Sequence, residues 1–377
     1  MDQSKENINM VNNIQENLES SQKAVRNSSL ELLRIISMLG IVLIHYFRHG
    51  MNPNDDIITT NRIIYELFSF IGRFGVICFV MITGYFMVNS KIKIRSLVKL
   101  VLEVIFFSMA ITIISMAICI EPFSIKTLIK SCFPIMFRQY WFISVYVALY
   151  ILIPFINILV YNLNKRQHLI LISILICIFS IIPMFTGQRW ETTTDFYQNL
   201  GLFITIYFIA AYVKLYPNKY FNNIKLNIII TVVMQIVVWS LIIIIMQFGN
   251  KIGIKDTQYF NDFNSPIVLI QSISIFLIFK NIDIKSSKFI NSIGKSTLAV
   301  YLIHEHPIIY PIIWKDIFKS EVYYNSSTML FLLNILLSVG IVFIVSIVID
   351  KIRIVLIEKK IFKIYDNKIR KYRFKKV

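Results

Sequence analysis

The sequence has few charged residues for its length. Only 16% of its 377 residues are Asp, Glu, Lys or Arg, whereas a soluble domain carries about 25%. Apolar residues make up 56% of the chain. This composition excludes a disordered chain, and it excludes an ordinary soluble enzyme because such a fold needs a larger polar surface. Continuous apolar runs such as 169–182 and 226–248 instead predict a membrane protein with several spans.

Cysteine is also scarce, with four residues and no CxxC spacing. The four lie in or beside apolar runs, so we interpret them as buried small hydrophobic side chains. The sequence shows no short-period internal repeat and no second soluble domain. Residues 1–29 are polar and precede the first apolar run, which predicts an N-terminal tail and not a cleaved signal peptide.

About ten apolar segments follow this tail, and each is long enough, or nearly so, to cross a bilayer as a helix. Because the runs are continuous and do not alternate, helices are favoured over a β-barrel. The sequence therefore predicts an all-α membrane bundle over 30–350, followed by a basic tail over 351–377. The segments are roughly 30–48, 64–88, 97–120, 141–163, 168–186, 197–215, 226–248, 265–280, 289–313 and 329–350.

The distribution of basic residues predicts the orientation of the bundle. With the N-terminus placed inside, most of the 39 Lys and Arg residues fall in the two tails and in the inner loops. The outer loops hold similar numbers of basic and acidic residues, so both termini are predicted to be cytoplasmic. We expect the basic tail to lie against anionic lipid of the bilayer. No nucleic-acid partner is expected, because the chain lacks a folded nucleic-acid-binding module.

The first span holds two candidate catalytic residues, Arg34 and His45. They are eleven residues apart, which places them on one helix face about 16 Å apart along the axis. Both would be costly against lipid, so a protein interior or wet cavity is expected. The alternative is that Arg34 snorkels to the inner boundary and His45 anchors the outer interface. Ser28 and Glu31 are expected to form a capping box that starts this helix.

The second span places Arg73 near mid-membrane, where it needs a counter-charge. It is a candidate functional residue, and the alternative is a buried structural ion pair. Glycines 72, 75 and 84 in the same span are expected to allow close helix packing.

The inner loop after this span carries Lys91, Lys93, Arg95 and Lys99. These side chains could bind the phosphates of a cytoplasmic donor such as a coenzyme A thioester, or they could be ordinary positive-inside charges. Trp141 and Tyr146 open the fourth span at the outer interface. An aromatic belt is expected there, and the alternative is a platform that stacks on a sugar substrate.

The ninth span contains His304, Glu305 and His306 at about the same depth as His45. A lone carboxylate at that depth is costly, whereas one beside an imidazole is stabilised. We therefore expect Glu305 or His304 within about 8 Å of His45, with room for one intervening water or side chain, and both facing a cavity that connects toward Arg34. Glu305 is the candidate catalytic carboxylate, and His304 is a candidate for substrate binding. No metal site is expected, because a helix would point His304 and His306 apart.

Four sequence segments resemble the membrane-bound acyltransferase family 3, the bacterial O-acyltransferases of envelope polysaccharides. The Arg34–His45 pair is similar to that family's Arg, ten residues, His motif, and Arg26, Leu30 and Glu31 are similar to its upstream pattern with Glu in place of Asp. The segments RFGVICFVMITGYF, YWFISVYVALYILIPF and IGKSTLAVYLIHEHP also look like family motifs. The inner loop departs from the family because it lacks Arg-x-x-Arg spacing.

This resemblance implies a multi-pass protein of the plasma membrane that uses acetyl-CoA, or another acyl-CoA, as a cytoplasmic donor. The implied acceptor is a hydroxyl of an extracytoplasmic or lipid-linked envelope glycan, and no metal is implied. His45 would act as the general base or as an acyl carrier, Arg34 would orient the donor, and Arg73 or Glu305 would assist. The alternative function is a transporter or exporter of a polysaccharide or small solute, since buried charges suit that class too.

Overall fold

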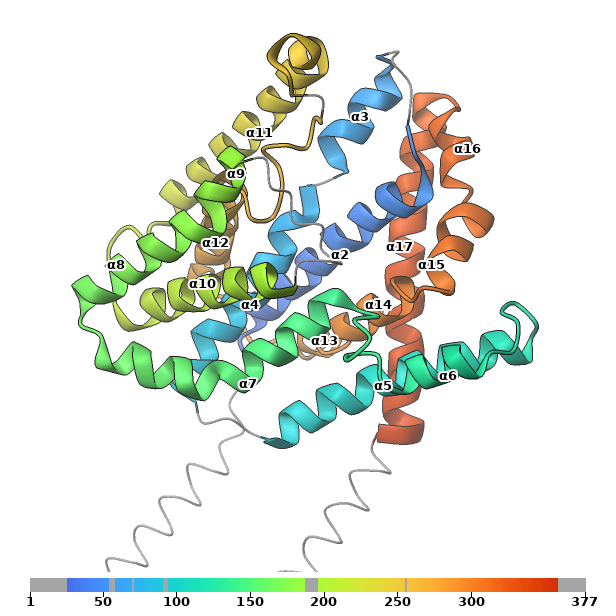
Figure 1. The fold of residues 1–377 in the computed structure, drawn as a ribbon, viewed down its shortest axis with the longest axis horizontal. Coiled ribbons are helices and arrows are strands. Elements are labelled where there is room, and N and C mark those ends of the chain that lie inside the picture. The colour runs from blue at the N-terminus through green and yellow to red at the C-terminus, as the bar shows by residue number, and fades with distance from the viewer. Residues whose placement is uncertain are drawn as a thin grey trace, which may run out of the picture.

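The computed structural model describes residues 26–53, 58–69, 71–90, 94–186, 196–254 and 256–358. All regular structure in these ranges is helical, which confirms the predicted all-α fold (Figure 1). The elements are α2 (Ser28–Gly50), α3 (Thr60–Phe68), η1 (Ile71–Arg73), α4 (Phe74–Met87), α5 (Ile94–Ala117), α6 (Ile125–Cys132), α7 (Trp141–Asn162), α8 (Lys165–Ile176), η2 (Cys177–Ile181), α9 (Ile182–Thr186), α10 (Phe196–Leu215), α11 (Ile224–Ile252), α12 (Pro266–Asn281), α13 (Lys288–Gly294), α14 (Thr297–His304), α15 (Ile309–Pro311), η3 (Ile312–Ile317), α16 (Ser320–Tyr324), α17 (Thr328–Arg353) and η4 (Ile354–Glu358).

Eight helical stretches of the described chain are long and apolar enough to cross a membrane. The eighth segment predicted from sequence, 265–280, matches α12 (Pro266–Asn281), which is shorter than the eight candidate spans. One predicted segment differs from the structure. The ninth, predicted over 289–313, is divided into α13, α14 and α15 followed by η3. A multi-pass helical membrane protein is confirmed, while the count of ten and the cytoplasmic termini stay predictions.

The interruption of the ninth segment after His304 has a local cause. Pro307 follows three residues later, and the residue before a proline is disfavoured in the helical conformation. Helix α14 therefore ends, and Glu305 becomes its C-cap with φ −98° and ψ 3°. This departure from helical geometry lets His304 and Glu305, which are consecutive in the chain, approach the same neighbouring helix.

The bundle has two hydrophobic cores, and α2 contributes to both. One core is built mainly from α4, α7, α10 and α12, and the other from α2, α5, α14 and α17. Figure 1 shows α8, α10, α11 and α12 on one side, α5 and α14 to α17 on the other, and α2 between them. Long rows of exposed Ile, Leu and Val on α11 and α17 are suited to lipid.

Glycines bring the second span against α2, as the sequence predicts. Gly72 lies directly on the backbone of Gly40, and Gly75 lies on the Ser37 carbonyl, so a Cβ at either position would collide with main chain. The expectation of four buried cysteines is met only by Cys78. Cys119 and Cys177 are exposed, because Cys119 lies in the turn after α5 and Cys177 begins η2, where neighbouring apolar side chains such as Ile118 and Ile178 also face outward. All four are free thiols.

Candidate active site

A cavity of about 800 Å³ follows α2 through the bundle. Arg26 and Arg34 line one end of it, and Arg48 and Met51 line the other. We call these the inner and outer ends, following the predicted orientation. Arg34 and Met51 are separated by about 25 Å along the helix, which is most of the roughly 30 Å thickness of a bilayer core. His45 lines the cavity between the two ends, so Arg34 and His45 both face the protein interior.

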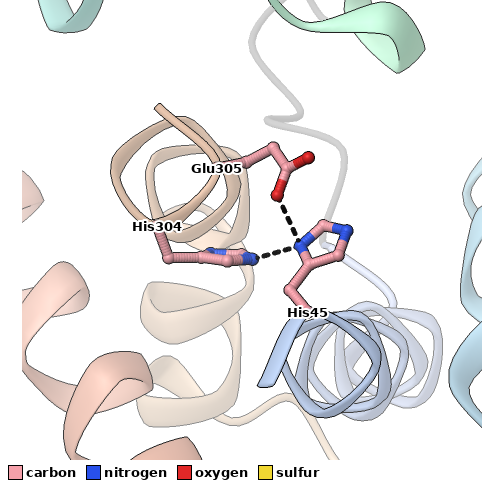
Figure 2. A group of neighbouring side chains, drawn as sticks. All are labelled: His45, His304 and Glu305. Atoms are coloured by element: carbon pink, nitrogen blue, oxygen red, sulfur yellow. Dashed lines mark hydrogen bonds and ion pairs between the residues drawn. The ribbon is translucent and has the colours of Figure 1, made fainter. Parts of the chain in front are cut away.

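His45 lies in direct contact with the end of α14 (Figure 2). Its Nδ1 is 2.8 Å from His304 Nε2 and 3.0 Å from Glu305 Oε2. His45 and His304 are both buried. The prediction that Glu305 or His304 lies close to His45 is therefore confirmed, because both contact its ring. Of the three residues, His45 lines the cavity while His304 and Glu305 lie behind it, and their assigned roles stay predictions.

The hydrogen positions in this cluster follow from a backbone contact. His304 Nδ1 lies 2.5 Å from the Val300 carbonyl oxygen, which can only accept a hydrogen bond. Nδ1 of His304 therefore carries its hydrogen, and Nε2 is left as an acceptor. His45 Nδ1 must then be the donor, shared between His304 and Glu305. This leaves a lone pair on His45 Nε2, which points away from both partners (Figure 2).

A second imidazole, His49, completes the cluster. His49 Nε2 lies 3.0 Å from the same carboxylate oxygen of Glu305, and its ring stacks on Tyr310 with centroids 4.2 Å apart. The sequence alone gave His49 no predicted role. The i, i+4 spacing was the available signal, because it places both rings toward one neighbour.

The cluster also has the composition of a metal site. His45 Nδ1, His304 Nε2 and a Glu305 carboxylate oxygen all lie within 4.8 Å of one another. Two imidazoles and a carboxylate form a ligand set that zinc uses. A metal ion here would have to displace the hydrogen on His45 Nδ1, because ligation needs that lone pair. The expected absence of a metal stays a prediction, and addition of zinc tests it.

Arg73 has a counter-charge that the sequence did not identify. Its guanidinium pairs with Asp262 at 3.3 Å and also donates to the Asn261 carbonyl, both in the segment before α12. Glu66 instead pairs with Arg62 at 2.6 Å and accepts hydrogen bonds from Thr257 and Gln258. Arg73, Glu66 and Asp262 all line the cavity toward its outer end. The Arg73–Asp262 ion pair is thus partly structural, yet it faces the space where a substrate would lie.

Trp141 and Tyr146 also line the cavity. Trp141 stacks on Phe263 with centroids 5.5 Å apart, and the Tyr146 hydroxyl is 3.0 Å from the Thr83 hydroxyl. An interfacial belt faces lipid, whereas these two rings face inward. Their position therefore favours the substrate platform over the belt.

Of the predicted donor-binding cations, Arg95 and Lys99 lie outside the cavity. Lys93 is outside the described residues. Arg95 is exposed at the start of α5, and Lys99 pairs with Glu358 at 2.5 Å. Neither of these two described side chains lines the cavity. Their predicted part in donor binding stays a prediction.

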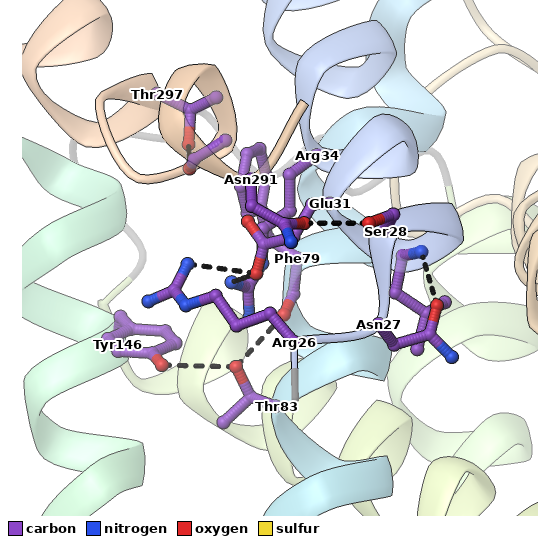
Figure 3. A network of polar contacts seen from close by, with 12 residues as sticks. Arg26, Asn27, Ser28, Glu31, Arg34, Phe79, Thr83, Tyr146, Asn291 and Thr297 are labelled. Carbon is purple, nitrogen blue, oxygen red and sulfur yellow. Dashed lines mark hydrogen bonds and ion pairs between the residues drawn. The ribbon is translucent and has the colours of Figure 1, made fainter. Parts of the chain in front are cut away.

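The inner end of the cavity is held by an ionic cluster at the start of α2 (Figure 3). Oε1 of Glu31 accepts from Arg26 at 3.0 Å and from Arg34 at 2.9 Å. The predicted capping box is wrong, because the N-cap is Asn27, whose side chain accepts from the Leu30 amide. Ser28 instead donates to Asn291, which ties α2 to α13. This frees Glu31 to hold the two arginines.

Comparison with known proteins gives one match. Residues 27–351 match a family model described as an acyltransferase domain, which is most of the chain. Comparison with curated proteins and with solved structures returned no match.

Proposed function

The chain belongs to the membrane-bound acyltransferase family 3, and from this premise we propose that it moves an acyl group across the plasma membrane. The donor is a cytoplasmic acyl-CoA, with acetyl-CoA the first candidate. The acceptor is a hydroxyl of an envelope glycan on the outer side. The observation that carries the proposal is the cavity lined by Arg34, His45 and Arg48, because it brings one imidazole to a space that extends over most of the thickness of a bilayer core.

In direct transfer, His45 acts as the general base. Its Nε2 lone pair takes the proton of the acceptor hydroxyl while the hydroxyl oxygen attacks the thioester carbonyl carbon. The carbon–sulfur bond then breaks, and the imidazolium returns the proton to the thiolate. Glu305, in contact with the opposite ring nitrogen, stabilises the imidazolium and holds the ring in position. A carboxylate behind an imidazole is the arrangement that this step requires.

The same geometry supports a two-step route. His45 Nε2 attacks the thioester carbonyl carbon, the carbon–sulfur bond breaks and coenzyme A leaves as the thiolate. The acceptor hydroxyl oxygen then takes the acyl group from Nε2, and its proton passes to the thiolate. Glu305 would hold the Nδ1 hydrogen in both routes. Rapid quenching with radiolabelled acetyl-CoA distinguishes them, because only the two-step route leaves label on the protein in the absence of acceptor.

Two residues of the cavity wall suit a sugar acceptor. Trp141 offers an aromatic face of the kind on which sugar rings stack. Arg73, oriented by Asp262, can donate to hydroxyl or carbonyl oxygens. We assign these two residues to the acceptor. Tyr146, whose hydroxyl contacts Thr83, lies instead toward the inner end, in the same group as Arg26 and Glu31 (Figure 3).

Two experiments test this function. The first compares the O-acyl content of envelope glycan in a deletion strain, in its complemented parent and in a strain carrying His45→Ala. Loss of the general base should reduce acylation at least about 10²–10⁴-fold while the protein still inserts in the membrane.

The second experiment follows release of coenzyme A from acetyl-CoA by the purified protein. A transporter with the same cavity would not consume the thioester. Near-normal glycan acylation by a folded His45→Ala protein would reduce His45 to a structural role.

A further inference from the structure

Three cationic side chains surround the inner end of the cavity. Arg26 and Arg34 come from the start of α2, and Lys295 comes from the turn between α13 and α14. Lys295 is exposed, and Arg26 keeps 42% of its side chain exposed, so both are open to a ligand entering from the inner side. The start of a 23-residue helix adds a further preference for anions.

Glu31 holds the side chains of Arg26 and Arg34 in position from outside the cavity. Its carboxylate is only 8% exposed and does not line the cavity, and one oxygen bonds to both guanidinium groups. The other oxygen, Oε2, is buried without a hydrogen-bond partner among the described residues and lies against Gly294. Each guanidinium has five N–H donors and uses one of its terminal nitrogens on Glu31. Donors therefore remain for an anion in the cavity.

The charges at this end match a diphosphate. Arg26, Arg34 and Lys295 carry three positive charges and Glu31 carries one negative charge, which leaves an excess of two. The diphosphate bridge of a coenzyme A thioester carries two negative charges. Guanidinium groups bind phosphate oxygens with two parallel hydrogen bonds, which makes arginine well suited to this role.

The distance to His45 fits the same ligand. Arg34 and His45 lie about 16 Å apart along α2. An extended phosphopantetheine arm can bridge this distance, so a diphosphate at Arg34 would place the thioester near His45 Nε2. Met38 and Ile41, which line the cavity between them, offer an apolar wall for that arm.

We propose that Arg26, Arg34 and Lys295, with Glu31 as the positioning residue, bind the diphosphate of the donor at the inner end of the cavity. The inference rests on the proposed function, because it takes the donor to be a coenzyme A thioester. A phospholipid headgroup presents similar chemistry. The depth of the cavity favours coenzyme A, since the acyl chains of a lipid would have to leave toward the bilayer.

The test measures binding and turnover by the full-length protein in phosphatidylcholine nanodiscs. Arg26→Gln and Lys295→Gln should each raise the KM for acetyl-CoA about tenfold, because a hydrogen bond to a charged group is lost. Their kcat should stay within about twofold. Turnover of S-acetylpantetheine, which lacks the phosphates, should be unchanged in both variants. Lys288→Gln, which removes an exposed charge on α13 away from the cavity, is the matched control.

Four other outcomes decide between the alternatives. Unchanged KM in Arg26→Gln and Lys295→Gln would overturn the inference while leaving the proposed function intact. An increase in KM confined to Arg95→Gln would do the same and place the donor on the inner loop. If phosphatidylglycerol raised the KM of the wild-type protein as a competitor, the site would hold lipid phosphate. If calorimetry showed phosphate-dependent binding of coenzyme A without acyl transfer, the binding site would stand and the proposed function would fail.

Discussion

Replacing Glu305 by Gln isolates the charge behind the candidate base. The substitution keeps the length and shape of the side chain, and the amide oxygen can still accept a hydrogen bond from His45 Nδ1. What is lost is the negative charge 3.0 Å from the ring that would become an imidazolium. The variant therefore separates charge stabilisation from simple packing.

The expected decrease in kcat follows from the contact between Glu305 and His45. A hydrogen bond to a charged group contributes about 1.5–3 kcal/mol, which corresponds to about 10- to 150-fold in rate. Glu305 shares the oxygen with His49, and its side chain is 16% exposed, so both solvent and a second donor weaken its effect on His45. We expect a decrease of roughly 30-fold in kcat, near the middle of that range.

The assay is release of free thiol from acetyl-CoA with an acceptor glycan, in nanodiscs, beside a binding measurement with coenzyme A. Binding should be unchanged, because Glu305 lies far from the inner end of the cavity. In the double variant with His45→Ala, the Glu305→Gln change should have no further effect, since the two residues act as one unit. A fully active Glu305→Gln protein, or additive losses in the double variant, would refute the assignment of Glu305 to His45.

Three other predictions test the topology, the positioning of Arg26 and Arg34 by Glu31, and the expected absence of a metal. In whole cells, single cysteines placed in outer loops should react with an impermeant reagent and those in the inner loop 89–96 should not; the reverse pattern would invert the orientation. Gly294→Ala should place a Cβ against Glu31 Oε2, which can move, so the protein should fold but show a KM for acetyl-CoA raised about 3- to 10-fold; an unchanged KM would contradict the role of Glu31 in positioning Arg26 and Arg34. Micromolar zinc should inhibit by occupying the atoms of His45, His304 and Glu305, and chelators should not reduce activity; loss of activity on chelation, restored by zinc, would make the site a metal centre.

Much of the fold could be predicted because hydrophobicity in a membrane protein is read over long windows. Runs of apolar residues locate most spans. Apart from a closed β-barrel, only a helix can cross lipid, because it makes all its backbone hydrogen bonds within one segment. The pairing of Arg34 with His45 along one face of α2 follows from helix geometry alone. The proximity of Glu305 to His45 was likewise predictable, because both spans start from the predicted inner face and advance by the same rise per residue.

What could not be predicted depends on where the chain stops being helical. In a continuous helix over 289–313, as predicted from sequence, consecutive side chains would diverge by about 100°. The break before Pro307 lets His304 and Glu305 meet one nitrogen of His45 together. In the same way, Asp262 reaches Arg73 from a loop 189 residues further along the sequence, and no periodicity relates the two. The residues that orient the candidate base and the acceptor side are therefore placed by helix ends and loops, whose positions depend on tertiary packing and not on hydrophobic pattern.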